Sequence, residues 1–151
     1  MKKYEGLYHY DDCGLDNIYL KGGVFVSAVD GEECFSITDL EGLHKVIALN
    51  LVKQQSPLSN KEFRFLRIEL DLTQKELAEK FGCDVQTIAN YEKGKSAIPK
   101  LEDLALRELY KEGLFRKIIN EMRSKKQLSA KPKRAVFEMN RTWHSKDKKA
   151  A

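Results

Sequence analysis

The sequence predicts an α+β fold, in which a small antiparallel sheet and one helix precede a bundle of helices. Between residues 18 and 37, short apolar runs alternate with glycine-containing turns, as in strands. From residue 40 onward, apolar side chains recur at the three- and four-residue spacing of helices. The predicted parts are a domain at 1–54, a linker at 55–58, a helical domain at 59–126 and a basic tail at 127–151.

The first domain is expected to hold a three-stranded meander, IYL (18–20), VFVSAV (24–29) and CFSI (34–37). KGG and DGE join these strands, and glycine suits such turns because it adopts positive φ easily. The period changes at Thr38, which is predicted to form a capping box with Glu41. Apolar residues at helical spacing then extend to about Lys53.

Three N-cap signals mark helices after the linker. Ser59 with Glu62 and Thr73 with Glu76 read as capping boxes, and Asp84 reads as the cap of VQTIANYEK. Gly94 is expected to end that third helix.

Two more helices are expected after Pro99, which suits a first helical turn. KLEDLALRELYKE is predicted to close at Gly113, and LFRKIINEMRSKK follows it. The tail has no strong period, although AVFEM (135–139) is compatible with a short strand.

Composition excludes several classes of protein. No apolar run approaches the ~18 residues of a membrane-spanning helix, and MKKYEGLYHYDD lacks the apolar stretch of a secretory signal. Cys13, Cys34 and Cys83 are odd in number, which fits a reducing compartment better than a disulfide framework. The protein is therefore expected to be cytoplasmic. No Ser/His/Asp or Cys/His set, carboxylate pair or phosphate loop stands out, so no enzymatic activity is expected.

Charge is distributed unevenly along the chain. Residues 1–50 carry 4 basic and 9 acidic side chains, whereas residues 125–151 carry 9 basic and 2 acidic ones, within a net charge of +4. An acidic N-terminal region and a basic C-terminal tail indicate different partners for the two ends of the chain. The tail is expected to be a solvated segment, with a supplementary phosphate contact as the alternative.

Residues 72–99, LTQKELAEKFGCDVQTIANYEKGKSAIP, contain two short helices separated by Gly82. Such short helices are marginal alone, so their apolar sides must pack together, and Ala78 is small enough for a close crossing. The expected apolar contacts are Leu77, Phe81, Cys83, Ile88 and Tyr91. The opposite face of the second helix, able to enter a DNA major groove, then presents Val85, Gln86, Ala89, Asn90 and Lys93.

This spacing resembles the Xre/Cro family of phage repressors and bacterial regulators over roughly residues 59–112. The matching residues are Gln74, Glu76, Leu77, Ala78, Gly82, Ile88, Tyr91, Glu92, Gly94, Lys95 and Pro99. The resemblance implies a compact bundle of about five helices counted from Ser59, with a helix-turn-helix that binds DNA. A purely structural bundle is the alternative.

The resemblance also implies roles for single residues. Gln74 would bond a DNA phosphate and brace the recognition helix. The residues implied to face the bases are Val85, Gln86, Thr87 and Asn90, with a solvated face as the alternative. Gln and Asn can bond adenine N6 and N7, and a valine methyl can contact the thymine methyl. Asp84 departs from the Thr or Ser common in the family, so it is assigned to the helix cap.

Further phosphate contacts are expected from Arg67, Lys93 and Lys95. The family pattern places Arg67 on the outward side of the first helix, close to the DNA backbone and paired with Glu92. Such a salt bridge would connect the first helix to the end of the recognition helix.

Three hypotheses about partners follow. The first is a repressor that binds a palindromic operator as a homodimer, through the helix from Leu114 to Lys126. The second is an antitoxin, because the layout resembles two-domain antitoxins that join an N-terminal zinc domain to a C-terminal helix-turn-helix. Its acidic N-terminal domain would bind a basic toxin, while the helix-turn-helix regulates the operon.

The third hypothesis is a zinc-dependent sensor, and its candidate ligands are His9, Cys13, Cys34 and His44. The zinc signal is weak because no C-x-x-C pair exists. The prediction is therefore that no metal or other cofactor is bound.

Overall fold

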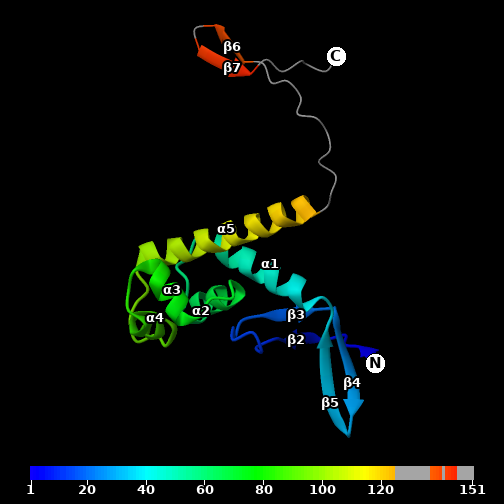
Figure 1. The fold of residues 1–151 in the computed structure, drawn as a ribbon. Helices are drawn as coiled ribbons and strands as arrows, with labels where there is room; N and C mark the ends of the chain where they lie inside the picture. The colour runs from blue at the N-terminus through cyan, green and yellow to red at the C-terminus, as the bar shows by residue number, and fades with distance from the viewer. Residues whose placement is uncertain (125–136, 141, 146–151) are drawn as a thin grey trace, which may run out of the picture. The chain divides into compact units, whose positions relative to one another are not determined.

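The computed structural model describes residues 1–124, 137–140 and 142–145 (Figure 1). It divides into two compact units, Met1–Arg116 and Lys117–Ala151. The strands are β1 (Lys2–Lys3), β2 (Leu7–His9), β3 (Tyr19–Lys21), β4 (Val24–Val29), β5 (Glu32–Ile37), β6 (Phe137–Asn140) and β7 (Thr142–Ser145). The helices are α1 (Leu40–Lys53), α2 (Asn60–Glu69), α3 (Gln74–Phe81), α4 (Val85–Glu92) and α5 (Lys100–Ser124). The predicted α+β class is confirmed.

The N-terminal strands form two sheets instead of the predicted meander. β4 and β5 make an antiparallel hairpin, with Val24 opposite Ile37 and Val29 opposite Glu32. β3 pairs with β2 in a separate sheet, because β1 occupies the edge of β4 that a meander would give to β3. The prediction that β3 pairs with β4 was therefore wrong.

The start of α1 also differs from the prediction. Asp39 caps this helix, since its carboxylate accepts the backbone N–H of Gly42 at 3.0 Å. The predicted cap at Thr38 was therefore wrong by one residue, and the N–H of Thr38 donates to the carbonyl of Gly23 at 2.8 Å, which holds Thr38 beside the sheet.

The next three helices begin where their caps predicted. Both capping boxes are present, Ser59 with Glu62 at α2 and Thr73 with Glu76 at α3. Asp84 caps α4, whose end is followed by Gly94 at φ 70°.

The two helices predicted after Pro99 are one continuous helix, α5. Gly113 does not end it, because a glycine inside a helix costs only about 1 kcal/mol. A Cβ on Gly113 would lie 3.3 Å from the Leu70 side chain, so the glycine permits a close approach of α2. Four helices therefore follow Ser59 among the described residues, not five.

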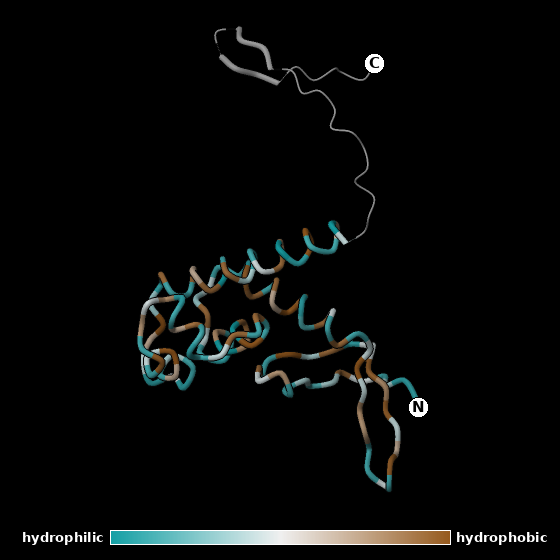
Figure 2. The backbone as a smooth tube through the Cα atoms, in the orientation of Figure 1, coloured by the Kyte–Doolittle hydropathy of each residue, from teal (hydrophilic) through white to brown (hydrophobic). Residues whose placement is uncertain are grey.

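One buried apolar cluster runs through residues 1–116. It contains Ile47 and Leu51 of α1 together with Phe63, Leu77 and Leu106 of the later helices. In Figure 2 apolar and polar positions alternate along these helices, as expected for elements with one buried side. The cluster crosses the predicted linker at 55–58, and the predicted domain boundaries stay a prediction.

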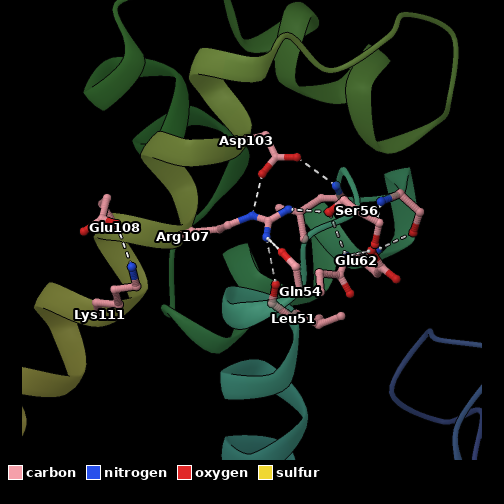
Figure 3. A network of polar contacts seen from close by, with 10 residues as sticks. Leu51, Gln54, Ser56, Glu62, Asp103, Arg107, Glu108 and Lys111 are labelled. Carbon is pink, nitrogen blue, oxygen red and sulfur yellow. Dashed lines mark hydrogen bonds and ion pairs between the residues drawn. The ribbon is translucent and has the colours of Figure 1, made fainter.

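Arg107 of α5 binds the chain around the predicted linker (Figure 3). Its Nε donates to Asp103 Oδ1 at 2.6 Å, and both residues are buried. Asp103 Oδ2 accepts the backbone N–H of Leu58 at 2.7 Å. Nη1 and Nη2 donate to three carbonyl oxygens, those of Leu51 (3.2 Å), Gln54 (2.6 Å) and Ser56 (2.8 Å).

His44 makes a second connection between the N-terminal segment and the bundle. Its Nε2 lies 2.7 Å from the Tyr10 hydroxyl, and its Nδ1 lies 2.7 Å from Glu69 Oε1 at the end of α2. Tyr10 is buried, and burial raises the pKa of its hydroxyl above the ordinary value. His44 thereby joins three segments of the chain.

Within the described residues, no helix has the length and apolar character needed to cross a membrane. In the tail, β6 pairs with β7, and it overlaps the strand predicted at AVFEM. The first two residues of that stretch and most of the basic tail lie outside the described residues.

Candidate nucleic-acid interface

α3 and α4 form the compact two-helix unit that the sequence predicted. Gly82 adopts φ 66° between them, a conformation that glycine permits without strain. Ala78 is 1% exposed, and its small side chain permits the close approach of α4. Of the predicted contact residues, Leu77, Ile88 and Tyr91 are buried, and Phe81 and Cys83 are half-buried against the same cluster.

Two titratable groups in this support have pKa values shifted further above neutral pH. Loss of solvent raises the pKa of the Cys83 thiol, and Glu102 raises it further. Burial is also the main cause of the raised pKa of Tyr91. Both groups are uncharged at neutral pH even at their ordinary pKa values, and the upward shifts make ionisation still less favourable.

The outer face of α4 carries most of the residues assigned to it. Val85 and Gln86 are exposed, and Thr87 and Asn90 are half-buried. Lys93 and Lys95, just after the helix, are exposed.

Ala89 was also predicted to project from this face, and that prediction was wrong. Ala89 is 8% exposed and lies between Ile88 and Glu92, which are both buried.

Gln86 and Asn90 form a connected pair of amides. Gln86 Nε2 donates to Asn90 Oδ1 at 3.0 Å, one helical turn away. The second Nε2 proton and Oε1 of Gln86 stay available, which are the donor and acceptor needed for adenine N7 and N6. The hydrogen bond orients the Gln86 amide without blocking a bidentate contact.

Asp84 lies at the start of the same helix. Its carboxylate accepts the backbone N–H of Gln86 at 3.1 Å, so its negative charge faces the positive end of the α4 dipole. The structure thus places Asp84 at the cap, where the sequence argument assigned it.

The inner side of the unit holds a buried salt bridge. Arg67 of α2 binds Glu92 of α4 through two hydrogen bonds, Nε to Oε1 at 2.5 Å and Nη2 to Oε2 at 3.1 Å. The side chains of Arg67 and Glu92 are only 11% and 4% exposed. Gln74 Nε2 also donates to Glu92 Oε2, at 2.8 Å. One carboxylate therefore joins α2, α3 and α4.

The outward position predicted for Arg67 was wrong. Its guanidinium lies between the helices, where Nη1 donates to the carbonyl of Leu72 at 2.7 Å. The charge of Glu92 and the Leu72 carbonyl attract it inward, because a buried carboxylate needs a charged partner. Arg67 is thus placed to hold α4 and is not displayed toward a phosphate.

Asn60 is a supporting residue that the sequence reasoning missed. Its Nδ2 donates to the backbone carbonyl of Glu92 at 3.2 Å, at the last turn of α4. Gly94 lies close by, since a Cβ there would be 3.5 Å from Asn60 Nδ2. An asparagine in the first turn after a cap gives no sequence signal for such a long-range contact.

The four candidate zinc ligands are bound to other groups or exposed. His9 Nε2 contacts the Asp16 carbonyl at 2.8 Å, and both ring nitrogens of His44 have protein partners. Cys13 Sγ lies 4.0 Å from the carbonyl of Tyr10, whereas Cys34 is exposed on β5. In the part of the chain that the structure describes, no three His, Cys, Asp or Glu side chains gather as a metal site.

Comparison with known families agrees with this geometry. The family described as helix-turn-helix matches residues 63–106, from α2 into α5. No curated protein and no solved structure matches the chain. Residues 63–106 therefore match an Xre/Cro-type helix-turn-helix domain, and this match supports a role in DNA-binding regulation of transcription.

Proposed function

We propose that the protein represses transcription by binding a palindromic operator as a homodimer. The main support is the arrangement of α4, which is fixed from inside by Glu92 and displays the oriented amide of Gln86 outside. A helix held in this way keeps its outward side chains in place before DNA arrives, which reduces the entropy lost on binding.

Base reading is assigned to Val85, Gln86, Thr87 and Asn90. The Gln86 amide can donate to N7 and accept from N6 of one adenine, while Val85 offers methyl groups to a thymine. Thr87 and Asn90 are half-buried, so their contacts are restricted to bases that approach the helix closely.

Phosphate contacts are assigned to Gln74, Lys93 and Lys95. Gln74 uses one Nε2 proton for Glu92 and keeps the other, so it can brace α4 and bond a phosphate at the same time. The two lysines are exposed at the end of α4 and add positive charge beside the reading face.

A second copy is proposed because one short recognition helix makes few base contacts. Two-fold pairing doubles the number of base pairs read, and a palindromic site follows from that symmetry. The predicted dimer surface, from Leu114 to Lys126, includes the exposed side chains of Phe115, Ile118 and Met122.

Selection of binding sites from random duplex DNA tests this proposal. We expect an enriched inverted repeat with half-sites about one or more helical turns apart. Enrichment of a single half-site would contradict the dimeric operator, and recovery of no preferred sequence would contradict base reading. Repression is tested with a reporter gene downstream of the selected site, where increased expression would indicate activation instead.

An antitoxin function is the second candidate, and two observations on the β4–β5 hairpin favour it. The β4–β5 hairpin carries the exposed acidic residues Asp30, Glu32 and Glu33 at its tip (Figure 1). β5 is also an edge strand of its sheet, and an edge can accept another strand. We propose a basic protein as its partner, which a toxin gene beside the gene of this protein would support.

Co-purification with the product of an adjacent gene tests the antitoxin proposal. Substitution of Glu32 and Glu33 by lysine should release the partner. Glu79→Lys is the control, because Glu79 is exposed on α3 and lies outside the hairpin. Retention of the partner by the hairpin variant would contradict the proposed surface.

A further inference from the structure

The outward face of α5 has a regular order of apolar and charged side chains. Leu101 is 75% exposed, Leu104 is 50% exposed and Phe115 is 66% exposed. Glu108 and Lys111 lie between them and are also exposed. A separate face of α5 is buried in the bundle and holds Asp103, Leu106, Arg107 and Tyr110.

The exposed residues form a single stripe along the helix. The five positions 101, 104, 108, 111 and 115 are separated alternately by three and four residues, which is the spacing of a helix–helix seam. We call these five residues the α5 stripe. Another face of the same helix is fixed in the core, so α5 cannot rotate to bury the apolar residues of the stripe.

We propose that the α5 stripe binds the same stripe of a second copy in antiparallel orientation. Leu104 would then lie against Phe115 of the partner subunit, and Glu108 against Lys111 of the partner subunit. The two-fold axis passes between positions 108 and 111, and each contact occurs twice. This inference rests on the proposed homodimer, and it moves the centre of the dimer surface toward the N-terminal half of α5.

The order of charges favours the antiparallel arrangement. Within one subunit, Lys111 Nζ lies 2.7 Å from Glu108 Oε1, and the side chains are 52% and 69% exposed. An exposed pair of this kind contributes little to stability, so exchanging partners costs little. A parallel arrangement would instead place Glu108 against Glu108 and Lys111 against Lys111, which repel each other.

Apolar complementarity is satisfied by the same arrangement. In the antiparallel pair, the aliphatic side chain of Leu104 lies against the aromatic Phe115 of the other copy, once on each side of the charged centre. Burial of these exposed side chains supplies the hydrophobic contribution that the exposed ion pairs lack.

Charge-reversal variants test the inference on the full-length protein by sedimentation without DNA. Glu108→Lys makes the centre wholly positive, and Lys111→Glu makes it wholly negative. Each variant alone should dimerise at least about tenfold more weakly, because like charges meet across the axis. An equimolar mixture should recover the dimer, since each Lys then faces a Glu. Glu79→Lys on α3 is the control and should dimerise as the unaltered protein does.

Several outcomes would overturn the inference. Dimerisation of both single variants at unaltered strength would exclude the α5 stripe as the interface. Weak association of the mixture would exclude the antiparallel contact between Glu108 and Lys111. Cross-linking gives a second measurement, in which a mixture of Leu104→Cys and Phe115→Cys proteins should form a disulfide-linked pair that neither forms alone. Circular dichroism of each variant verifies folding.

DNA binding separates this inference from the proposed function. A protein that dimerises through the α5 stripe but shows no sequence preference on DNA would support the inference and contradict the function. A monomer that binds a single half-site specifically would contradict the inference and the palindromic operator, while retaining base reading.

Discussion

Arg67 and Glu92, which are 25 positions apart in the chain, form a two-point salt bridge almost entirely out of contact with solvent. The same carboxylate accepts the amide of Gln74. Three helices of the DNA-binding domain therefore depend on one acidic side chain. Its effect on DNA recognition is indirect, because Glu92 lies on the inner side of α4.

Glu92→Ala should destabilise the protein by about 3–5 kcal/mol, because it leaves the buried Arg67 without its charged partner. A double-mutant cycle with Arg67→Ala, measured by urea unfolding, should show that the two losses are far from additive. Glu112→Ala is a matched control, since its ion pair with Arg116 is exposed and should change stability by less than about 1 kcal/mol. Additive losses at Arg67 and Glu92 would contradict their coupling.

Gln86→Ala should weaken binding to the selected operator by about 1–3 kcal/mol, because a bidentate base contact contributes about that much. Binding to random duplex DNA should change little. Titration of both DNAs by fluorescence anisotropy measures the two effects. Equal losses on both would show that Gln86 does not read a base.

Lys95→Ala should weaken binding to all sequences alike, because a phosphate contact carries no sequence information. The slope of log K against log salt should become shallower by about 0.9, the contribution of one phosphate contact. Anisotropy titrations over a series of salt concentrations measure this slope. An unchanged slope would remove Lys95 from the contact surface.

Arg107→Ala should cost about 3–5 kcal/mol, since it removes the partner of the buried Asp103. It also frees three backbone carbonyls, one in the last turn of α1 and two in the segment that follows it. Hydrogen exchange should rise at residues 54–58 more than at α4, which Arg107 does not contact. Uniform protection in the variant would indicate that other contacts hold this segment.

Glu76 gives a pH dependence whose sign is determined by its hydrogen bonds. The backbone N–H of Thr73 is the main cause that lowers the pKa of this carboxyl below its ordinary value of 4.5. A carboxyl whose pKa is lower in the folded state stabilises the protein at pH values above its unfolded-state pKa. This stabilisation is lost as the pH falls through the folded-state pKa. Glu76→Gln should therefore destabilise the protein at pH 7 and have a smaller effect at pH 3. Glu79→Gln on the same helix is the control, and an effect of Glu76→Gln that does not change with pH would contradict this cause.

Local signals in the sequence predicted the DNA-binding domain well. The caps of α2, α3 and α4 depend on side chains within three residues of the groups they bind, so the sequence contains both partners side by side. The apolar spacing of Leu77 and Ile88 likewise follows from helical geometry alone.

Predictions that depended on distant partners were less successful. β3 pairs with β2 because β1 already occupies β4, which no local pattern in VFVSAV reveals. Gly113 was read as a helix end, although Leu70 uses the space that it leaves. Both errors arose from contacts between segments far apart in the chain.

Burial of charged residues was the hardest feature to predict. Asp103 and Arg107 lie at positions i and i+4 beside Leu106 and Tyr110, on the face that packs inward. Charged residues interleaved with an apolar stripe are the signal that could have indicated their burial. Arg67 gave a similar signal in α2, beside the buried Leu66.

The carbonyl oxygens that Arg107 binds lie in the last turn of α1 and just after it, and these contacts fix the path by which the chain enters α2. A different N-terminal segment joined at this point by recombination would have to present its carbonyls to the same guanidinium. A DNA-binding domain that could be exchanged freely would need a surface at this point whose polar groups are satisfied without α1. In evolution, α1 and the DNA-binding helices are therefore expected to be inherited together, so that insertions between residues 51 and 58 should be rare among homologues that keep Asp103 and Arg107.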